Sequence, residues 1–361
     1  MMAPTRVAIV NDVPLVAEAL RRIVAATPDC SVAWIARDGL DALRRVHADR
    51  PDVILMDLVM PVMDGVEATR RIMAAAPCPI LLVTATVSGN LTMVFEALGH
   101  GALDVVQTPG FGRSGTDDGT LELRRKLASV ARLVSPPGDR GRARDAGLGS
   151  AAPRPTAGAG VPRPPVPMVA PDPPLVLVAA STGGPQAIAA LLDGAGAGLP
   201  AAVVIVQHLD ARFSDSFVAW LRQRSSLPVA AAVAGERPRR GEVAVAVGEE
   251  HLRVDAMGVF RFSPDPDDVP LRPSADVLFE SVAARPGARG IAVVLTGMGR
   301  DGARGMLALR RARFHTIAQD PATSVIGGMP RAAVAAGGAM EVLPIEGIGP
   351  RIAAVLRGRA G

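Results

Sequence analysis

Short apolar runs alternate with longer amphipathic stretches in this 361-residue chain, and no other feature of the sequence restricts its fold more. Within the first 134 residues, apolar runs predict strands at 7–10, 32–36, 53–56, 80–83 and 104–106. Helical spacing predicts helices at 14–26, 41–47, 66–75, 94–98 and 121–133. This strand–helix order predicts a parallel sheet with helices on both faces. We therefore expect residues 1–134 to form a doubly wound α/β domain.

The composition changes between residues 135 and 173, where Pro, Gly, Ala and Arg dominate and no hydrophobic period persists. Such a segment cannot bury enough apolar surface to offset its chain entropy, so we interpret it as a linker. The alternation resumes in residues 174–361, with strands predicted at 175–180, 202–206, 229–232, 243–247, 252–255, 259–262, 291–295 and 314–318, some of the shorter ones paired as hairpins. Helices are predicted at 186–192, 215–224, 274–284 and 303–311. This pattern predicts a second, Rossmann-like α/β domain.

Composition and charge argue against several classes of protein. The 39 Lys and Arg residues exceed the 35 Asp and Glu residues by 39 − 35 = 4, and much of this small excess lies in the linker, so no nucleic-acid partner is expected. Cys30 and Cys78 lie outside any paired metal-ligand spacing, which favours a reduced, cytoplasmic protein. The sequence shows no signal peptide and no apolar run of the ~18 residues that a membrane span needs, so no membrane insertion is expected.

Three predicted strands of the second domain end in polar residues that are suited to acyl transfer. Ser181 directly follows the strand predicted at 175–180, and His208 follows the strand at 202–206 after one residue. Asp301 lies in the loop after the strand at 291–295. Because ligands bind beyond the carboxyl ends of the strands in open parallel sheets, we expect these side chains to share one crevice. A Ser, a His and an Asp in one crevice are the components of a catalytic triad.

The chemistry of each residue type indicates its role. Ser181 is the candidate nucleophile, His208 the base that takes its proton, and Asp301 the residue that orients the imidazole. Backbone N–H groups around Thr182 or Met298 are candidate oxyanion donors. Taken singly, the Ser-Thr-Gly-Gly run also fits a phosphate cradle, and His208 fits a structural role. The chain order Ser…His…Asp also differs from that of the α/β-hydrolases.

Three segments carry a resemblance to a known family. They are Ala-Ser-Thr-Gly-Gly-Pro at Ser181, Val-Gln-His at His208 with Phe213 beyond it, and Leu-Thr-Gly-Met-Gly-x-Asp-Gly at Asp301. These segments resemble the catalytic domain of the chemotaxis protein-glutamate methylesterases, the CheB family. The resemblance implies hydrolysis of glutamate γ-methyl esters on methyl-accepting chemoreceptors, deamidation of receptor glutamines, and a triad of Ser181, His208 and Asp301. We expect no cofactor in this site.

Polar residues also follow three predicted strands of the first domain, namely Asp12, Asp57 and Thr84. Clustered carboxylates repel one another unless a cation joins them, and Mg²⁺ favours sites with one or two carboxylates. Asp57 is then a candidate nucleophile toward a phosphodonor, and Thr84 a candidate switch residue that hydrogen-bonds the phosphate. The alternative is that Asp12 only caps the helix that begins at Pro14.

The run Met-Asp-Leu-Val-Met-Pro-Val-Met-Asp-Gly, which contains Asp57, resembles the phosphoacceptor loop of response-regulator receiver domains, whose sheet is flavodoxin-like. This resemblance implies that Asp12, Asp57 and the backbone carbonyl of Val59 hold Mg²⁺. It also implies a CheA-like histidine kinase as the phosphodonor.

Two positions depart from the receiver pattern. Asn11 stands where an acid is usual, which removes a charge from the metal site, and Thr108 stands where a lysine normally precedes a proline. We therefore expect phosphorylation, and its coupling to the switch, to differ from the family norm. The opening Val-Asn-Asp-Val-Pro-Leu and the run around Asp57 further resemble the WspF branch of the family, which is associated with surface sensing and cyclic-di-GMP control.

A chain with a switch domain and an acyl-transfer site suggests a gating hypothesis. The unphosphorylated receiver packs over the Ser181 crevice, and phosphorylation of Asp57 loosens it. The main alternative is a non-catalytic response regulator whose output domain binds a partner or a phosphorylated ligand, which would not need the three triad residues together. A DNA-binding regulator would need a helix-turn-helix output module, which the predicted strands do not supply.

Overall fold

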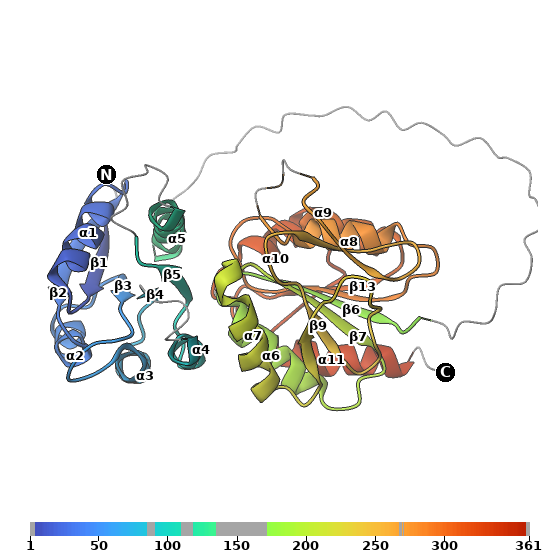
Figure 1. Ribbon diagram of the computed structural model, residues 1–361, viewed down its shortest axis with the longest axis horizontal. Coiled ribbons are helices and arrows are strands. Elements are labelled where there is room, and N and C mark those ends of the chain that lie inside the picture. The colour runs from blue at the N-terminus through green and yellow to red at the C-terminus, as the bar shows by residue number, and fades with distance from the viewer. Residues whose placement is uncertain are drawn as a thin grey trace, which may run out of the picture.

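The N-terminal part of the protein folds as a parallel sheet between two layers of helices (Figure 1). This computed structural model describes residues 4–84, 91–109, 118–134, 172–266, 269 and 271–358. The strands are β1 (Thr5–Val10), β2 (Cys30–Ala36), β3 (Val53–Met56), β4 (Ile80–Thr84) and β5 (Asp104–Gln107), in the order β2-β1-β3-β4-β5. The helices are α1 (Pro14–Ala25), α2 (Gly39–Ala48), α3 (Gly65–Ala75), α4 (Leu91–Gly99) and α5 (Asp118–Val134). The predicted doubly wound α/β class is confirmed.

The C-terminal part is a second α/β layered structure with a seven-stranded sheet in the order β14-β13-β12-β6-β7-β9-β8. Its strands are β6 (Leu175–Ala180), β7 (Ala202–Gln207), β8 (Val229–Ala231), β9 (Val243–Val245), β12 (Gly290–Val294), β13 (His315–Gln319) and β14 (Glu341–Leu343), and neighbouring strands in this order run parallel. In Figure 1, α8 (Ala275–Ala283), α9 (Ala303–Arg311) and α10 (Gly328–Ala335) cover one face, and α6 (Gly184–Ala195), α7 (Ser214–Arg224) and α11 (Ile345–Gly358) cover the other.

The strand order of the second sheet brings three strand ends to one point. β6 lies in the middle of the sheet, with β7, β9 and β8 next to one another on one side. The later strands β12, β13 and β14 lie on the other side of β6. The direction of strand addition therefore reverses between β6 and β12, and ligands bind beyond the carboxyl ends at such a reversal. These central strands and β7 are buried along their whole length, which explains their uninterrupted apolar sequences.

Several short elements differ from the predictions. The strands predicted at 229–232 and 243–247 pair in parallel within the main sheet as β8 and β9, and do not form a hairpin. An antiparallel hairpin does form from β10 (His251–Val254) and β11 (Phe260–Ser263). The short 3₁₀ helix η1 (Ala211–Phe213), α10, β14 and α11 were not predicted.

The two parts meet through an aromatic contact between α4 and α7. Phe95 of α4 lies with its ring centroid 6.1 Å from that of Phe217 and 5.7 Å from that of Trp220. All three side chains are buried, and one hydrophobic cluster continues from the layer of α2, α3 and α4 into the layer of α6, α7 and α11. Apolar burial thus joins the two halves of the protein.

Nearly all of the predicted linker at 135–173 lies outside the described residues. The domain boundaries at 1–134, 135–173 and 174–361 therefore stay a prediction. In the described part of the chain, no helix combines the length and the apolar character that a membrane crossing requires.

Candidate functional site

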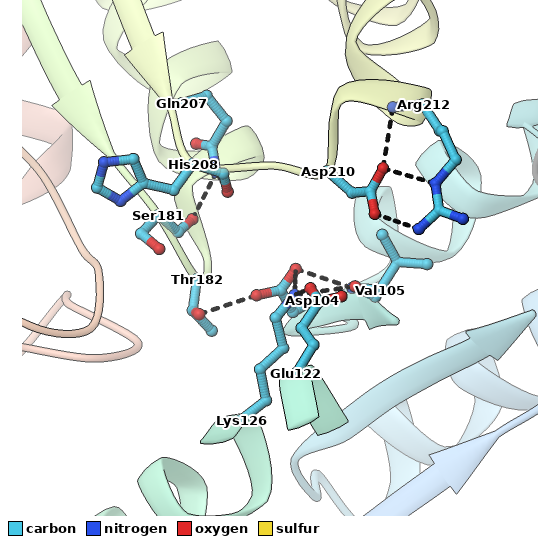
Figure 2. Close-up of polar contacts among 10 residues, drawn as sticks. All are labelled: Asp104, Val105, Glu122, Lys126, Ser181, Thr182, Gln207, His208, Asp210 and Arg212. Carbon is cyan, nitrogen blue, oxygen red and sulfur yellow. Dashed lines mark hydrogen bonds and ion pairs between the residues drawn. The ribbon is translucent and has the colours of Figure 1, made fainter. Parts of the chain in front are cut away.

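The register of the second sheet brings the candidate nucleophile and base to neighbouring strand ends. Ala180 of β6 is the partner of Gln207 of β7, so Ser181 and His208 leave adjacent strands side by side, as Figure 2 shows. Asp301, in the loop after β12, contacts the imidazole: its Oδ2 lies 2.8 Å from His208 Nε2.

The contact between His208 and Asp301 determines which nitrogen of the imidazole is available to Ser181. Because Nε2 faces Asp301, Nδ1 is the ring nitrogen left for Ser181. Ser181 Oγ and the imidazole share no hydrogen bond among the described residues. Such contacts often tighten only when substrate binds, so this geometry is compatible with a base and a nucleophile.

Asp301 lies at the N-terminus of α8, where donors converge on its carboxylate. The Ala275 N–H lies 2.6 Å from Oδ2, and the Ser274 hydroxyl and the Asp276 N–H lie 2.7 and 3.0 Å from Oδ1. Burial alone would raise the pKa of Asp301. The hydrogen bonds and charge of His208, with the donors of α8, outweigh burial and lower the pKa to about 2. The residue is therefore a carboxylate at any working pH.

The turn that carries Ser181 depends on two glycines. Gly183 has a φ of +77°, and a Cβ there would lie 2.7 Å from the Cβ of Val325. A Cβ on Gly184 would lie 2.0 Å from Gln207 Oε1. Gln207 is buried, and its Nε2 donates to the backbone carbonyls of Ser181 and His208, 2.8 and 3.0 Å away. This side chain links the two strand ends that carry the candidate nucleophile and the candidate base.

The predicted oxyanion residues lie beside this turn. Thr182 is buried, and its carbonyl accepts a hydrogen bond from Thr296 Oγ1 at 3.0 Å. Met298 is half-buried and follows Gly297, which bridges to Gly327. Thr182 thus follows Ser181 directly, and Met298 lies in the loop after β12, so their role as oxyanion donors stays a prediction.

Residues at β5 of the N-terminal sheet contact the turn that follows Ser181. Thr182 Oγ1 donates to Asp104 Oδ2 of β5 at 2.8 Å (Figure 2). The Gly183 N–H donates to the Leu103 carbonyl, just before β5, at 3.0 Å. Arg212 of η1 also donates to Gln107 of β5. The residues that follow the nucleophile therefore have partners on the receiver-like sheet.

A partly buried ion cluster contacts Asp104. Lys126 Nζ of α5 lies 2.9 Å from Asp104 Oδ1 and 3.0 Å from Glu122 Oε1, and it donates to the Val105 carbonyl at 2.9 Å. Burial alone would lower the pKa of Lys126, but the two carboxylates raise it, so the ammonium stays charged.

The candidate phosphoacceptor lies at the carboxyl end of β3. Asp57 Oδ2 accepts a hydrogen bond from Asn11 Nδ2 at 2.9 Å, and Oδ1 accepts one from the Leu58 N–H at 2.7 Å. Burial, with a contribution from the charge of Asp12, raises the pKa of Asp57 to about 6. A cation at this point would relieve both effects.

The other predicted receiver residues lie near the carboxyl ends of β3 and β4. Val59 lies two residues after it and is exposed, and Thr84 is buried as the last residue of β4. The Thr108 N–H donates to the Thr84 carbonyl at 2.9 Å, which puts the lysine-replacing position beside the switch candidate. The alternative role of Asp12 as a helix cap is wrong, because Val13 is the N-cap residue of α1 and no side chain caps it.

Comparisons with known proteins bear on both halves. Residues 176–352 match the model of the CheB methylesterase family, and residues 7–110 match that of the response regulator receiver domain. A protein-glutamate methylesterase/protein-glutamine glutaminase of Cupriavidus metallidurans is 47% identical over 347 residues, which are 96% of this chain and 97% of that protein. This chain belongs to the CheB methylesterase family. A relative of the same name from Bordetella avium is also 47% identical, and the match covers 96% of each chain. The CheB catalytic domain of Thermotoga maritima is 32% identical, with a TM-score of 0.49, over 51% of this chain and 99% of that one.

Within this CheB chain, sequence reasoning missed the residues that hold the site together. Gln207 stood out only as a polar residue in an apolar strand, and Ser274 only as the start of a helix. Lys126 is the sole lysine, yet its partner Asp104 is 22 residues away in sequence, and no periodicity links them.

Proposed function

We propose that the protein is a phosphorylation-regulated protein-glutamate methylesterase that hydrolyses γ-methyl esters of chemoreceptor glutamates and deamidates receptor glutamines. The observation that carries this proposal is the 2.8 Å contact of His208 Nε2 with Asp301 Oδ2, beside Ser181 on the next strand end. Family membership supports the same activity. A non-catalytic output domain would have no need for this arrangement.

The chemistry proceeds in two halves. His208 Nδ1 takes the proton of Ser181 as Oγ attacks the ester carbonyl carbon, and Asp301 stabilises the imidazolium. Backbone N–H groups around Thr182 and Met298 receive the oxyanion. Collapse of the tetrahedral intermediate breaks the bond to the methoxy oxygen, which leaves as methanol with the proton from His208 and leaves a glutamyl ester on Ser181.

Water then completes the turnover. His208 takes a proton from water, the hydroxide attacks the acyl-enzyme, and Ser181 leaves with that proton as free glutamate forms. With a glutamine side chain, the first step releases ammonia in place of methanol. Both reactions therefore need only the same three side chains.

The receiver site supplies the regulation. Asp12, Asp57 and the Val59 carbonyl would hold Mg²⁺, and the raised pKa of Asp57 beside a second carboxylate fits a site that a cation completes. The bound cation would neutralise charge as phosphate reaches Asp57. Asp57 is then the phosphoacceptor, with a histidine kinase as donor, and Thr84 responds to the phosphoryl group.

The contacts at β5 support the gating hypothesis. Asp104 and Leu103 occupy the Thr182 hydroxyl and the Gly183 N–H, next to the nucleophile. A receptor helix cannot approach Ser181 from that side while β5 is in place. Phosphorylation of Asp57 would weaken these contacts and open the crevice. The pathway, whether flagellar chemotaxis or the surface sensing of the WspF branch, stays a prediction.

The test is methanol release from a methylated chemoreceptor, with and without a small phosphodonor. We expect release by the wild type to rise with phosphodonor, and Ser181→Ala to abolish it. The Asp57→Asn variant should keep the basal rate and lose the stimulation. Unchanged release by Ser181→Ala would refute the triad, whereas stimulation of Asp57→Asn would refute the phosphoacceptor.

A further inference from the structure

The N-terminus of α8 does more than neutralise Asp301. Ser274 is the N-cap residue of α8, and it is completely buried. Its hydroxyl donates to Asp301 Oδ1 at 2.7 Å, while the Val277 N–H approaches the same hydroxyl oxygen at 3.4 Å as the cap interaction. One hydroxyl thus connects the helix cap to the carboxylate that holds His208.

The backbone of Ser274 is held in turn by a second histidine. The Ser274 N–H donates to His251 Nδ1 at 3.2 Å. His251, the first residue of β10, is completely buried. A chain of contacts therefore runs from His251 through Ser274 and Asp301 to His208, across a hairpin, a helix and the active-site loop.

The accepting role of His251 requires a neutral ring. Only an imidazole nitrogen without a proton can accept from the Ser274 N–H, so the proton of the neutral ring lies on Nε2. Burial lowers the pKa of His251, which keeps the ring in this form at neutral pH. The ring is thus a fixed acceptor.

We propose that Ser274 is a positioning residue of the esterase, which fixes the Asp301 carboxylate for its contact with His208, and that His251 sets the position of Ser274. This inference rests on the proposed function, because it assigns Ser274 an effect only through the triad. An Asp301 side chain without the Ser274 bond keeps its charge and its two N–H donors, but loses a donor that sets its rotation. Misaligned Asp301 holds the imidazole less well in the transition state, while the substrate still binds.

The test uses the full-length protein with saturating phosphodonor and measures methanol release from methylated receptor. We expect Ser274→Ala to lower kcat by about tenfold, as expected for the loss of one hydrogen bond to a charged group, and to leave KM unchanged. Ser274→Thr, which keeps the hydroxyl, should restore most of kcat. In an Asp301→Asn background, the same Ser274→Ala change should lower kcat by less than about twofold, because residues that act as a unit are not additive.

A matched control lies on the same helix. The Ser281 hydroxyl donates to the Leu278 carbonyl at 2.7 Å and accepts from the Val254 N–H at 3.0 Å, and it does not contact Asp301. Ser281→Ala should therefore keep kcat even if its melting temperature falls. An unchanged kcat in Ser274→Ala, or an equal loss in both backgrounds, would overturn the proposal.

A second pair of variants covers the case in which Ser274→Ala does not fold. His251→Asn keeps an acceptor near the position of Nδ1 and should keep most of kcat, whereas His251→Leu should lose it with KM unchanged. Equal kcat in these two variants would contradict the proposal. Methanol release by Ser181→Ala distinguishes a failure of the positioning role from a failure of the proposed esterase function. If that variant is inactive while the Ser274 and His251 variants are fully active, only the positioning role fails.

Discussion

At the scale of single residues, two carboxylates in similar positions have opposite properties. Asp301 and Asp57 both lie beyond carboxyl ends of parallel strands, yet the pKa of the first falls to about 2 and that of the second rises to about 6. Both are desolvated and both accept hydrogen bonds, but the donors of α8 and the imidazole outweigh burial at Asp301. At Asp57 burial outweighs the donors, and the charge of Asp12 adds to it. One site therefore maintains a permanent anion, whereas the raised pKa of the other fits its proposed roles in binding a cation and accepting a phosphoryl group.

The lowered pKa of Asp301 predicts a pH dependence of stability. The folded pKa of about 2 lies below the ordinary value of 3.8, so ionisation stabilises the folded state above pH 3.8, and this stabilisation is lost as the pH falls toward 2. The contribution is about 2 kcal/mol. We expect the difference in free energy of unfolding between the wild type and Asp301→Asn to shrink as the pH falls from about 4 toward 2. Urea denaturation at a series of acid pH values measures this, and a difference that stays the same between pH 4 and pH 2 would contradict it.

Asn11 predicts a second effect at this scale. Its Nδ2 donates to Asp57 Oδ2 at 2.9 Å, and the residue is buried. Asn11→Asp replaces this hydrogen bond by repulsion of roughly 1–4 kcal/mol, so the variant should be less stable without a metal. Saturating Mg²⁺ should restore its stability more than that of the wild type, because the third carboxylate binds the cation more tightly.

Thermal melting with and without Mg²⁺ measures both parts of this prediction. Asn11→Ala is the control, since it removes the hydrogen bond without adding charge. If Mg²⁺ stabilises Asn11→Asp no more than Asn11→Ala, the assigned metal position is wrong.

At the scale of elements, the turn between β6 and α6 limits what residue can follow the nucleophile. Gly183 has a left-handed backbone conformation, with a φ of +77°. It also lies close to its neighbours, because a Cβ there would be 2.7 Å from the Cβ of Val325. The left-handed conformation alone costs an L-residue about 1–2 kcal/mol. The close contact adds to this and displaces the loop that carries Val325.

Gly183→Ala should therefore lower the free energy of unfolding by more than about 2 kcal/mol and reduce kcat strongly. Gly337→Ala is a matched control, because Gly337 has a φ of +72°, a Cβ there would meet nothing within 4 Å, and the residue lies away from the triad. This control should lose only about 1–2 kcal/mol and keep its kcat. Urea denaturation and methanol release measure the two effects, and equal losses in both variants would show that the close contact is harmless.

The central elements could be predicted from the sequence because they are buried on both faces. The runs at 175–180, 202–206 and 291–295 have no polar interruption, so β6, β7 and β12 were found almost to the residue. The helix α11 was missed because Gly347, Gly349 and Pro350 disfavour a helix. Tertiary packing overrides this preference: Ile348 and Ile352 are buried, and a Cβ on Gly349 would lie 2.5 Å from the Leu191 carbonyl oxygen of α6.

The candidate site shows the same limit. Strand ends indicated Ser181, His208 and Asp301, because parallel strands bring their carboxyl ends to one edge. Contacts such as Ser274 with Asp301 or Thr182 with Asp104 join residues 27 and 78 positions apart. They follow from how whole layers pack, which no local pattern in the sequence encodes.

At the scale of the whole molecule, the gating hypothesis gives separate tasks to the polar and the apolar contacts between the two halves. Asp104 and Leu103 occupy groups next to the candidate nucleophile, so the gating hypothesis assigns them control of substrate entry. The rings of Phe95, Phe217 and Trp220 contribute attraction between the halves, since their apolar surface is buried. Weakening the aromatic contact should thus open the crevice without any change in the triad.

Phe95→Ala tests this division. Truncation of a buried Phe removes about 3–5 kcal/mol of packing, part of which lies between α4 and α7. We expect methanol release without phosphodonor to rise several-fold, and the phosphodonor to add little. Phe95→Leu, which keeps apolar contact, should stay close to the wild type. Combined with Asp57→Asn the high basal rate should persist, and combined with Ser181→Ala it should vanish. A folded Phe95→Ala protein with the basal rate of the wild type would show that the α4–α7 contact does not hold the receiver over the active site.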